Sequence, residues 1–365
     1  MSWPSALMKT KYGWNSGCVI YPLTIPTTSA ANCYAAGNLH RLTATRKPEP
    51  DGPIVCSTGP SFICSAPGKP LLMTQPPLRI GILGLGSLGS VLAWHWRDLP
   101  LVALPRDQHS ACNLKVQVQQ QLWQQTLPCW QGEALDWLVI CTKAAATQTA
   151  LTPWRNHLTA VKNILLVQNG MGQQQQLADW LQEQQLPCQL WAGMSTEGAY
   201  RADDRVVYAG QGDNLIGRWG TEITDADHAV VTPPHTRIVN NIASQLRTKL
   251  AINAVINPLT AQLRCHNGEL LQNPLYRQQL DALSTEIAGL YACLGWPEAA
   301  GLVERVQQVA AATAANQSST LQDVLHNRPT ELPYICGYLL KIAAEKNYAL
   351  PLTTALYQQL HEISA

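Results

Sequence analysis

The chain has 365 residues and a formal net charge of +1, and only 13% of its residues are charged. This balance gives no reason to expect a nucleic acid or an anionic membrane surface as a partner, and no stretch approaches the roughly 18 uninterrupted apolar residues of a membrane-spanning helix. The length is enough to bury two ordinary cores, so we expect a soluble protein of two domains.

Residues 1–77 differ in composition from the rest of the chain. They are rich in Pro, Ser, Thr and Gly, contain Glu49 and Asp51 as their only acidic residues, and show no helical or strand period. Such a segment buries too little apolar surface to offset its ordering entropy. It fits a disordered tail, a targeting peptide or a start codon assigned too far upstream. We favour a start at Met73, which would make residues 1–72 dispensable.

From Leu78 onward, short and mainly apolar runs alternate with helical stretches. A helix is predicted over Ser87–Trp96, and the predicted strands are Leu78–Leu83, Leu101–Leu104, Trp137–Thr142, Asn163–Gln168, Gln189–Ala192 and Asn214–Gly217. Strands that alternate with helices predict right-handed βαβ units and a parallel sheet.

After about residue 240 the strand patterns stop and long helical patterns follow. The predicted helices are Ala243–Leu263, Pro274–Cys293, Pro297–Ala315, Pro333–Lys346 and Thr353–Ile363. Three of them open with proline, which suits the first position of a helix. We therefore expect an α/β domain over residues 78–240 and an all-α domain over residues 241–365, with a ligand site in the cleft between them.

The loop Gly84-Leu85-Gly86-Ser87-Leu88-Gly89 follows the first predicted strand and opens the first helix. In such a G-x-G-x-x-G loop the first glycine makes a tight turn, the second lets the backbone approach a pyrophosphate, and the third lets the helix pack on the strand. The helix N-terminus adds unpaired N–H groups and a positive dipole end. The loop alone could be a plain turn, but between a strand and a helix it predicts dinucleotide binding.

The end of the second predicted strand indicates which dinucleotide is bound. A site that prefers NAD usually has Asp or Glu there to hold the ribose hydroxyls. Here the strand leads into Pro105-Arg106-Asp107, and an arginine can pair with a 2′-phosphate through its fork of donors. Although Asp107 is adjacent, we expect NADPH rather than NADH.

A polar stripe runs along the first helix of the second domain. Lys249, Asn253 and Asn257 are four residues apart and share one helix face, and their neighbours are almost wholly apolar. Burying these groups without partners would be costly. They therefore either form internal hydrogen bonds between helices or line a cleft that holds a polar ligand. Pro258 removes a backbone donor and is expected to bend or end the helix.

A lysine on such a helix face suits the reduction of a ketone. Hydride that reaches a carbonyl carbon leaves an alkoxide, which an ammonium group can stabilise and protonate. A carboxylate nearby would position the ammonium and tune its pKa. Glu331 is a candidate for that carboxylate.

From about Arg79 to the C-terminus the sequence resembles the ketopantoate reductase family. The blocks that carry the resemblance are Gly84–Gly89, Val167–Gly172, Lys249–Ala261, Asn267–Leu270, and Asn316–Asp323 followed by Glu331. The resemblance implies a Rossmann domain joined to a helical domain like that of 6-phosphogluconate dehydrogenase. It also implies an NADP-dependent oxidoreductase that acts on CH–OH groups and reduces 2-dehydropantoate to (R)-pantoate in pantothenate and coenzyme A biosynthesis.

The resemblance further implies roles for single residues. Lys249 would donate a proton to the ketone oxygen, and Glu331 would contact both the nicotinamide ribose and the catalytic network. The implied substrate residues are Lys249, Asn253, Asn257, Asn267, Asn316, Gln317, Ser318 and Ser319. The implied cofactor residues beyond the glycine loop are Arg106 and Lys143 near the adenine, Asn169 near the nicotinamide ribose, Ala199 through its backbone, and Glu331. Ala145 and Ala146 stand where family members often carry larger or polar side chains, which leaves the adenine packing open.

The cysteines and histidines show no pattern of a disulfide framework or a metal site. The chain has 11 cysteines without a C-x-x-C pair, and its nine histidines lack metal-ligand spacing. Reduced thiols in the core, as in a cytoplasmic protein, are expected at Cys112, Cys129, Cys141, Cys188, Cys265, Cys293 and Cys336.

Two other functions stay open on the sequence. One is a reductase of the same architecture that acts on another 2-oxo acid or a 3-hydroxy acid, which the spacing around Lys249 disfavours without fixing the substrate. The other is a non-enzymatic NADPH-binding regulator, which would not need Lys249, two asparagines and Glu331 together. The sequence leaves the choice between a monomer and a homodimer open.

Overall fold

The structure is a computed structural model that describes residues 77–364, all of them within one compact unit that begins at Leu72. The expectations of disorder, of a start at Met73 and of dispensable residues 1–72 lie outside the described residues. Within residues 77–364 no helix has the length and apolar character needed to cross a membrane.

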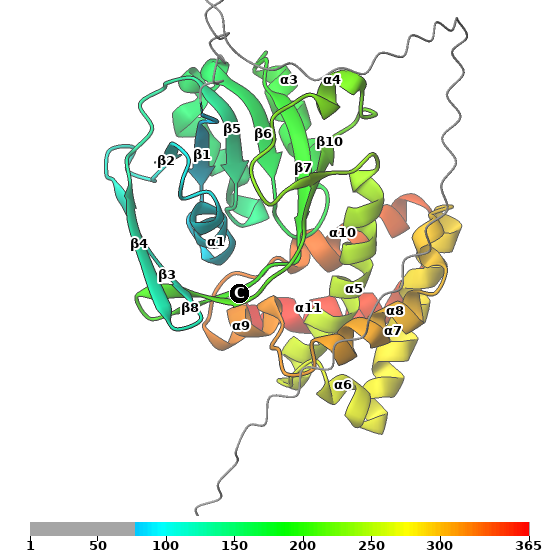
Figure 1. Cartoon of the computed structure of the whole chain (residues 1–365). Coiled ribbons are helices and arrows are strands. Elements are labelled where there is room, and N and C mark those ends of the chain that lie inside the picture. The colour runs from blue at the N-terminus through cyan, green and yellow to red at the C-terminus, as the bar shows by residue number, and fades with distance from the viewer. Residues whose placement is uncertain (1–76, 365) are drawn as a thin grey trace, which may run out of the picture. The chain divides into compact units, whose positions relative to one another are not determined.

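A seven-stranded sheet organises the first part of the described chain (Figure 1). Its strands, in spatial order, are β11 (Arg237–Ile238), β10 (Asn214–Arg218), β7 (Gln189–Ser195), β6 (Val161–Leu166), β5 (Leu135–Ile140), β1 (Ile80–Leu83) and β2 (Leu101–Ala103). The five strands from β7 to β2 are parallel, and β10 is antiparallel to β7. The predicted parallel sheet is confirmed, and no predicted strand end is displaced by more than three residues.

The apolar runs form strands here because the sheet is covered on both faces. Successive residues of β5 and β6 belong to different apolar clusters: Leu138 and Ile164 lie in one, Val139 and Leu165 in the other. This is the alternation expected when neighbouring side chains point to opposite faces of a sheet. The helices of this part are α1 (Ser87–His95), α2 (Thr147–Leu151), α3 (Gln173–Glu183) and α4 (Asp225–His228), with 3₁₀ turns η1 (Ala144–Ala146) and η2 (Thr152–Ala160).

A four-stranded sheet lies next to α1, and the sequence analysis did not predict it. Its order is β4 (Gln121–Leu127), β3 (Cys112–Val118), β9 (Arg205–Gly210) and β8 (Gly198–Ala202). In Figure 1 this sheet curves around α1, which lies between it and β1. Val91 of α1 packs there against Val116 and Val206. The sheet therefore encloses the helix that the glycine loop opens.

The second part of the described chain is helical, as predicted. Its helices are α5 (Ile242–Leu263), α6 (Glu269–Gln272), α7 (Pro274–Cys293), α8 (Leu302–Ala312), α9 (Ser319–Leu325), α10 (Leu332–Glu345) and α11 (Pro351–Ser364), with a 3₁₀ turn η3 (Pro297–Ala299). Helix α5 contacts α7 to α11 and also β7 and β10, so it joins the two parts. The single helix predicted over Pro297–Ala315 was wrong, because Gly301 at φ +66° separates η3 from α8.

Helix α5 continues through Pro258 to Leu263, so the helix does not end at the proline. A proline lacks the N–H that would bond the carbonyl of Ala254, four residues earlier. The thiol of Cys336 on α10 lies 3.9 Å from that carbonyl oxygen and replaces the missing donor. Burial raises the pKa of Cys336 to about 12, so its sulfur keeps the proton that it donates.

A bidentate ion pair fixes α5 to η3. The guanidinium of Arg247 donates to the carboxylate of Glu298 at 2.9 and 3.2 Å, and it lies 4.9 Å from the ring centre of Trp296. The two paired side chains are only 16% and 5% exposed. Arginine suits this position because its planar fork pairs with a carboxylate and stacks on an aromatic ring at once.

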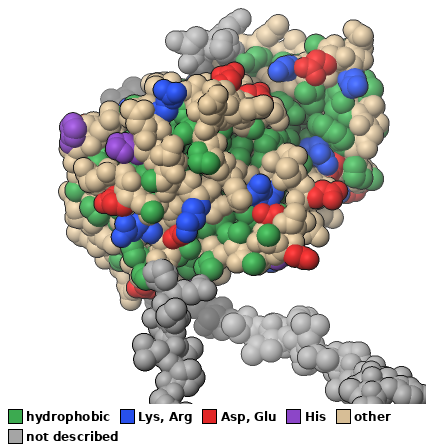
Figure 2. Space-filling model, turned by 90° about the horizontal axis from the view of Figure 1, so that it is seen from above, with side chains coloured by type: hydrophobic (Ala, Val, Ile, Leu, Met, Phe, Trp, Pro, Cys, Tyr) green, Lys and Arg blue, Asp and Glu red, His purple; other side chains and the backbone are tan. Residues whose placement is uncertain are grey.

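On one face of the molecule, charged side chains are dispersed rather than gathered by sign. On the face drawn in Figure 2, Lys and Arg side chains lie among Asp and Glu side chains, with no region of one sign. In the described part of the chain, no three His, Cys, Asp or Glu side chains are grouped so that they could hold a metal ion. The seven described cysteines are free thiols, but Cys293 is exposed and not in the core as expected.

Candidate active site

Three loops meet at the edge of the seven-stranded sheet where β1, β5 and β6 end. They contain the glycine loop Gly84–Gly89, Thr142-Lys143 and Gln168-Asn169. The amide of Gln168 joins two of them, because it donates to the carbonyl oxygen of Thr142 at 2.8 Å. The carboxyl edge of a parallel sheet is where α/β proteins bind ligands.

The three glycines of the loop have different surroundings. Gly84 has φ +95°, and a Cβ there would lie 2.5 Å from the backbone nitrogen of Thr142. A Cβ on Gly89 would overlap the carbonyl oxygen of Gly84, whereas a Cβ on Gly86 would meet no atom within 4 Å. The first and third glycines are therefore required by the chain's own packing. Gly86 instead leaves open space beside its backbone, as a phosphate-binding turn requires.

The N-terminus of α1 has no side-chain cap at Gly86. Its first N–H groups are therefore available to an anion. The carbonyl oxygen of Leu85 accepts from the hydroxyl of Ser90 at 3.4 Å and from the guanidinium of Arg201 at 3.3 Å. Arg201 comes from β8, more than a hundred residues away in the sequence, and sequence reasoning missed it. Leu88 packs against the apolar cluster under the loop, and Ser87 begins the helix.

Arg106 lies exposed in the loop after β2, and it forms no hydrogen bond or ion pair with any described residue. The neighbouring Asp107 turns toward its own loop, where its carboxylate accepts from the backbone N–H groups of His109 and Ser110, both at 3.1 Å. A hydrogen bond from the side chain of Ser110, together with these two backbone bonds, lowers the pKa of Asp107 to about 2. Asp107 thus stays ionised, and Arg106 is free to bind an external anion.

Lys249 projects from α5 toward the end of β7. Its ammonium donates to the carbonyl oxygen of Ser195 at 2.6 Å. Burial lowers the pKa of Lys249 to about 8, and the charge of Glu331 opposes that shift. A lysine with this pKa is mostly protonated at neutral pH and can still give up its proton. Sequence reasoning did not foresee the Ser195 carbonyl, because a backbone acceptor leaves no mark in a sequence.

Glu331 lies at the N-terminus of α10 and faces the loop after β6. Its carboxylate accepts from the side-chain amide of Asn169 at 3.1 Å and also from the backbone N–H of Ala144. Burial raises the pKa of Glu331, while Asn169, Lys143, Ala144 and Lys249 each favour its ionised form. The structure therefore brings Lys249, Glu331 and Asn169 together from three separate segments.

Lys143 crosses from the loop after β5 to the helical part. Its ammonium bonds Asp323 of α9 at 2.5 Å and also bonds the carbonyl oxygen of Pro329. The other oxygen of Asp323 accepts from Arg328 at 3.1 Å. Lys143 thus anchors the segment that leads into Glu331. Asp323 lies in a block that the sequence analysis singled out, but no role was predicted for it.

The asparagine stripe continues along α5 toward the N-terminus of α9. Asn257 is buried, and its amide lies 3.5 Å from the hydroxyl of the exposed Ser319. The partly exposed Asn253, between Lys249 and Asn257, forms no side-chain hydrogen bond with any described residue. Ser318 has a structural role, because its buried hydroxyl caps α9 through Leu321 N–H and accepts from Thr260 at 2.7 Å.

The remaining predicted substrate residues lie near the start of α6 and before α9. Asn267 is buried and donates to the hydroxyl of Thr313 at 2.9 Å, but its side-chain oxygen has no partner among the described residues. The carbonyl oxygen of Asn316 accepts from the backbone of Asn267 at 3.0 Å, and the side chains of Asn316 and Gln317 are exposed. Ala199 lies on β8, where it packs on the apolar cluster around α1.

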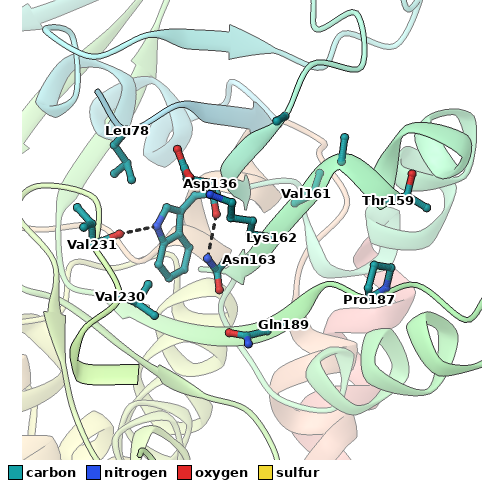
Figure 3. A pocket seen from close by; sticks show the side chains of 13 residues that line it. Leu78, Asp136, Thr159, Val161, Lys162, Asn163, Pro187, Gln189, Val230 and Val231 are labelled. Atoms are coloured by element: carbon teal, nitrogen blue, oxygen red, sulfur yellow. Dashed lines mark hydrogen bonds and ion pairs between the residues drawn. The ribbon is translucent and has the colours of Figure 1, made fainter. Parts of the chain in front are cut away.

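A cavity of about 860 Å³ at the opposite edge of the sheet is a poorer candidate (Figure 3). It is lined by residues at the starts of β5, β6 and β7, where parallel sheets do not bind ligands. Three of its polar side chains already have partners: Asp136 accepts from Lys162 at 2.8 Å, and Asn163 donates to the carbonyl oxygen of Asp136 at 3.0 Å. We therefore assign the candidate site to the carboxyl edge.

Comparisons with known proteins identify the family of the chain. The family model "Ketopantoate reductase PanE/ApbA" matches residues 80–221, and "Ketopantoate reductase PanE/ApbA C terminal" matches residues 241–364. The chain is 31% identical over 294 residues to the 2-dehydropantoate 2-reductase of Yersinia pestis, which covers 77% of this chain and 93% of that protein.

Solved structures share the fold. The probable 2-dehydropantoate 2-reductase panE from Bacillus subtilis is 28% identical, with a TM-score of 0.64, over 78% of this chain and all of that chain. A D-mandelate dehydrogenase solved with NADH and anilino(oxo)acetate is 16% identical, with a TM-score of 0.65, over 79% of this chain and 98% of that one, and it shows the fold alone. From the matches of both family models and of the relative in Yersinia pestis, this chain belongs to the ketopantoate reductase family.

Proposed function

We propose that this chain uses NADPH to reduce 2-dehydropantoate to (R)-pantoate, a step in pantothenate biosynthesis. The observation that carries the proposal is the ammonium of Lys249, whose pKa is lowered to about 8 and which lies near Glu331 and Asn169 at the carboxyl edge of the sheet. Family membership supports the substrate, because the relatives in Yersinia pestis and Bacillus subtilis are 2-dehydropantoate 2-reductases.

The glycine loop fits a dinucleotide. The open space at Gly86 and the uncapped start of α1 suit a pyrophosphate, and the positive charge of Arg201 beside Leu85 adds to the attraction. Arg106 would pair with the 2′-phosphate, which is why we propose NADPH over NADH. Asn169 and Glu331 would line the nicotinamide end, and Ala199 would contact the cofactor through its backbone. When bound, NADPH supplies the hydride for the reduction.

The ammonium of Lys143 does not face an adenine site in this structure, because Asp323 and the carbonyl oxygen of Pro329 already hold it. We therefore assign it first to holding the segment before Glu331. An adenine contact would have to be made along its apolar stem, or after the ammonium has left these partners.

Lys249 would give its proton to the oxygen on C2 as the carbonyl becomes an alcohol. An ammonium with a pKa of about 8 is a stronger acid than an ordinary lysine, which favours proton transfer near neutral pH. The negative charge of Glu331 keeps the ammonium from losing its proton too early, since it raises the pKa of Lys249 against the effect of burial. Asn169 holds Glu331 in place.

The substrate would bind along the polar stripe of α5. Among residues 77–364, the side chain of Asn253 and the buried side-chain oxygen of Asn267 have no hydrogen-bond partner, and Asn257 and Ser319 face each other at 3.5 Å. The amides of Asn253 and Asn257 could donate to the carboxylate and the ketone of 2-dehydropantoate, and the side-chain oxygen of Asn267 could accept from its hydroxyl. Ser318 is left out of this set because its hydroxyl has internal partners, and Asn316 and Gln317 stay predicted substrate residues at the exposed rim.

The test is an assay of NADPH consumption by the full chain with 2-dehydropantoate and a panel of 2-oxo acids. The sharpest competitor is 3,3-dimethyl-2-oxobutanoate, which has the same carbon skeleton but lacks the hydroxyl. A site that hydrogen-bonds the hydroxyl should prefer 2-dehydropantoate in kcat/KM by at least about a hundredfold, and chiral chromatography should identify the product as (R)-pantoate. Equal or better turnover of another 2-oxo acid would assign the chain to a different reductase of the same family.

A further inference from the structure

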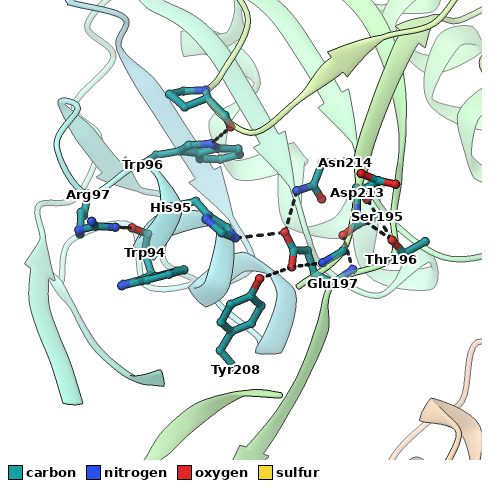
Figure 4. A network of polar contacts seen from close by, with 12 residues as sticks. Trp94, His95, Trp96, Arg97, Ser195, Thr196, Glu197, Tyr208, Asp213 and Asn214 are labelled. Atoms are coloured by element: carbon teal, nitrogen blue, oxygen red, sulfur yellow. Dashed lines mark hydrogen bonds and ion pairs between the residues drawn. The ribbon is translucent and has the colours of Figure 1, made fainter. Parts of the chain in front are cut away.

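Glu197 is a buried carboxylate close to the site, and the proposed reaction does not use it directly. Its side chain is only 1% exposed and accepts four hydrogen bonds (Figure 4). One oxygen accepts from His95 and from Asn214, both at 3.1 Å. The other accepts from the hydroxyl of Tyr208 at 2.7 Å and from the backbone N–H of Gly212 at 2.9 Å.

These donors satisfy the carboxylate fully. An ionised carboxylate is an acceptor only, with about four lone-pair sites, so all of them are engaged. Burying such a charge is costly unless it is paired in this way. Burial and the bond to Glu197 raise the pKa of Tyr208, so its hydroxyl stays a donor. The imidazole of His95 must carry its proton on Nε2, because the carboxylate cannot donate.

One of the four donors, His95, lies far from the others in the sequence, and the other three lie within residues 208–214. His95 ends α1, Tyr208 lies on β9, Gly212 lies in the loop that follows, and Asn214 begins β10. Glu197 itself lies in the connection between β7 and β8. Its carboxylate therefore ties this connection to α1, to the small sheet and to β10 at once.

The connection between β7 and β8 touches both sides of the proposed site. At one end, the carbonyl oxygen of Ser195 holds the ammonium of Lys249 at 2.6 Å. At the other end lies Ala199, a predicted cofactor contact, where the pairing of β8 with β9 is irregular. Besides the bonds of Glu197, the segment is held by the backbone N–H of Thr196, which donates to the carbonyl oxygen of Asp213 at 2.9 Å.

We propose that Glu197 is a positioning residue for the reduction: its carboxylate fixes the Ser195–Ala199 segment, and the Ser195 carbonyl oxygen in turn holds the ammonium of Lys249. The catalytic part of this inference rests on the proposed function. The contact between Lys249 and the Ser195 carbonyl oxygen is present in the free protein, so it can be tested without substrate or cofactor.

If Glu197 positions Lys249, its substitution should change the pKa of Lys249 and not only the stability of the fold. A carbonyl oxygen at hydrogen-bond distance favours the charged form of an amine. If the Ser195–Ala199 segment shifts, the ammonium loses this acceptor while it remains buried, so the pKa of Lys249 falls. A change that only lowered the melting temperature would leave the pKa of the folded protein unchanged.

Two variants and a matched control test the inference in the full chain. Glu197→Gln replaces one carboxylate oxygen with an amide NH₂, which cannot accept from the two groups that donate to that oxygen in the wild type, so it should loosen the segment. Tyr208→Phe removes one bond but keeps the negative charge of Glu197. Tyr200→Phe makes the same chemical change on β8 at a side chain that is 40% exposed and has no hydrogen bond to Glu197.

The measurement is the rate of acylation of Lys249 as a function of pH, followed by mass spectrometry of its peptide in the free enzyme. The wild type should titrate near pH 8. In Glu197→Gln the pKa of Lys249 should be roughly one unit lower than in the wild type. In Tyr208→Phe it should shift in the same direction, and in Tyr200→Phe it should equal the wild-type value. The alkaline limb of kcat for reduction should move with the labelling midpoint.

If Glu197→Gln folds and Lys249 is labelled in it with the same pH midpoint as in the wild type, the inference is overturned. A shift in Glu197→Gln together with a wild-type midpoint in Tyr208→Phe would also overturn it, because the effect would then come from the charge and not from position. If Glu197→Gln does not fold, Tyr208→Phe decides the matter alone. Labelling shifts in a chain that does not reduce 2-dehydropantoate would refute the proposed function and leave the positioning of Lys249 intact.

Discussion

If Lys249 is the proton donor, reduction and its reverse should depend on pH in opposite directions. Burial lowers the pKa of Lys249 to about 8, with Glu331 acting in the other direction. Reduction requires the ammonium form, because the oxygen on C2 takes up a proton. Oxidation of pantoate requires the free amine, because the same oxygen must lose one.

The size of the effect follows from that pKa. A group with a pKa of about 8 is about nine-tenths protonated at pH 7 and about one-tenth protonated at pH 9. The kcat for reduction should therefore fall roughly tenfold between these two pH values, and the kcat for oxidation should rise by a similar factor. Absorbance of the reduced nicotinamide reports both rates, measured with saturating substrates and at constant ionic strength.

Two substitutions sharpen the test. Lys249→Ala should lower kcat by about 10²–10⁴ and abolish the pH limb, while NADPH binding stays nearly intact. Glu331→Gln should move the limb to lower pH, because it removes the negative charge that raises the pKa of Lys249. If both reaction directions changed with pH in the same sense, or if Lys249→Ala kept the limb, another group would have to donate the proton.

The remaining predictions concern the cofactor and stability. Arg106→Ala should weaken NADPH binding by roughly ten- to a hundredfold and NADH binding far less, measured by fluorescence titration; equal losses would remove it from the 2′-phosphate. Gly86→Val should weaken both cofactors without lowering the melting temperature, since its side chain enters open space; unchanged affinity would show that the cofactor lies elsewhere. Gly89→Ala should unfold more readily, because its Cβ overlaps a backbone oxygen, and a wild-type melting temperature would contradict that packing. Glu298→Ala should reduce the free energy of unfolding in urea by about 3 kcal/mol, because it leaves the mostly buried Arg247 unpaired; a change below about 1 kcal/mol would mean that water reaches the guanidinium.

The fold could be predicted where a segment is apolar on both faces or on one helical face. The strands β1, β5 and β6 and the helices α5 and α7 have such patterns, and the structure confirms them. The four-stranded sheet was missed because its strands are half polar, although Leu114 and Val116 alternate with polar residues in β3 and are buried there. Gly301 split a predicted helix because a single residue at positive φ redirects the chain.

The candidate site could be predicted only in part, because most of its contacts join residues that are far apart in the sequence. Spacing along α5 was enough to put Lys249 and the two asparagines on one face, but it says nothing about which distant residues face them. The pairing of Glu331 with Asn169 joins positions 162 residues apart, and that of Lys143 with Asp323 joins positions 180 apart. Such contacts depend on tertiary packing and have no local pattern. The Ser195 carbonyl could not be found at all from side-chain chemistry.

The contacts of Lys143, Asn169 and Lys249 share one property: each joins the sheet-bearing part of the chain to the helical part. Lys143 reaches Asp323 and Pro329, Asn169 reaches Glu331, and Lys249 reaches Ser195. A hinge motion that opened this boundary would have to break these bonds together, and it would carry Lys249 and Glu331 away from Ser195, Asn169 and the glycine loop. Opening would thus switch the chemistry off, and only the shut form would hold a complete set of reacting groups.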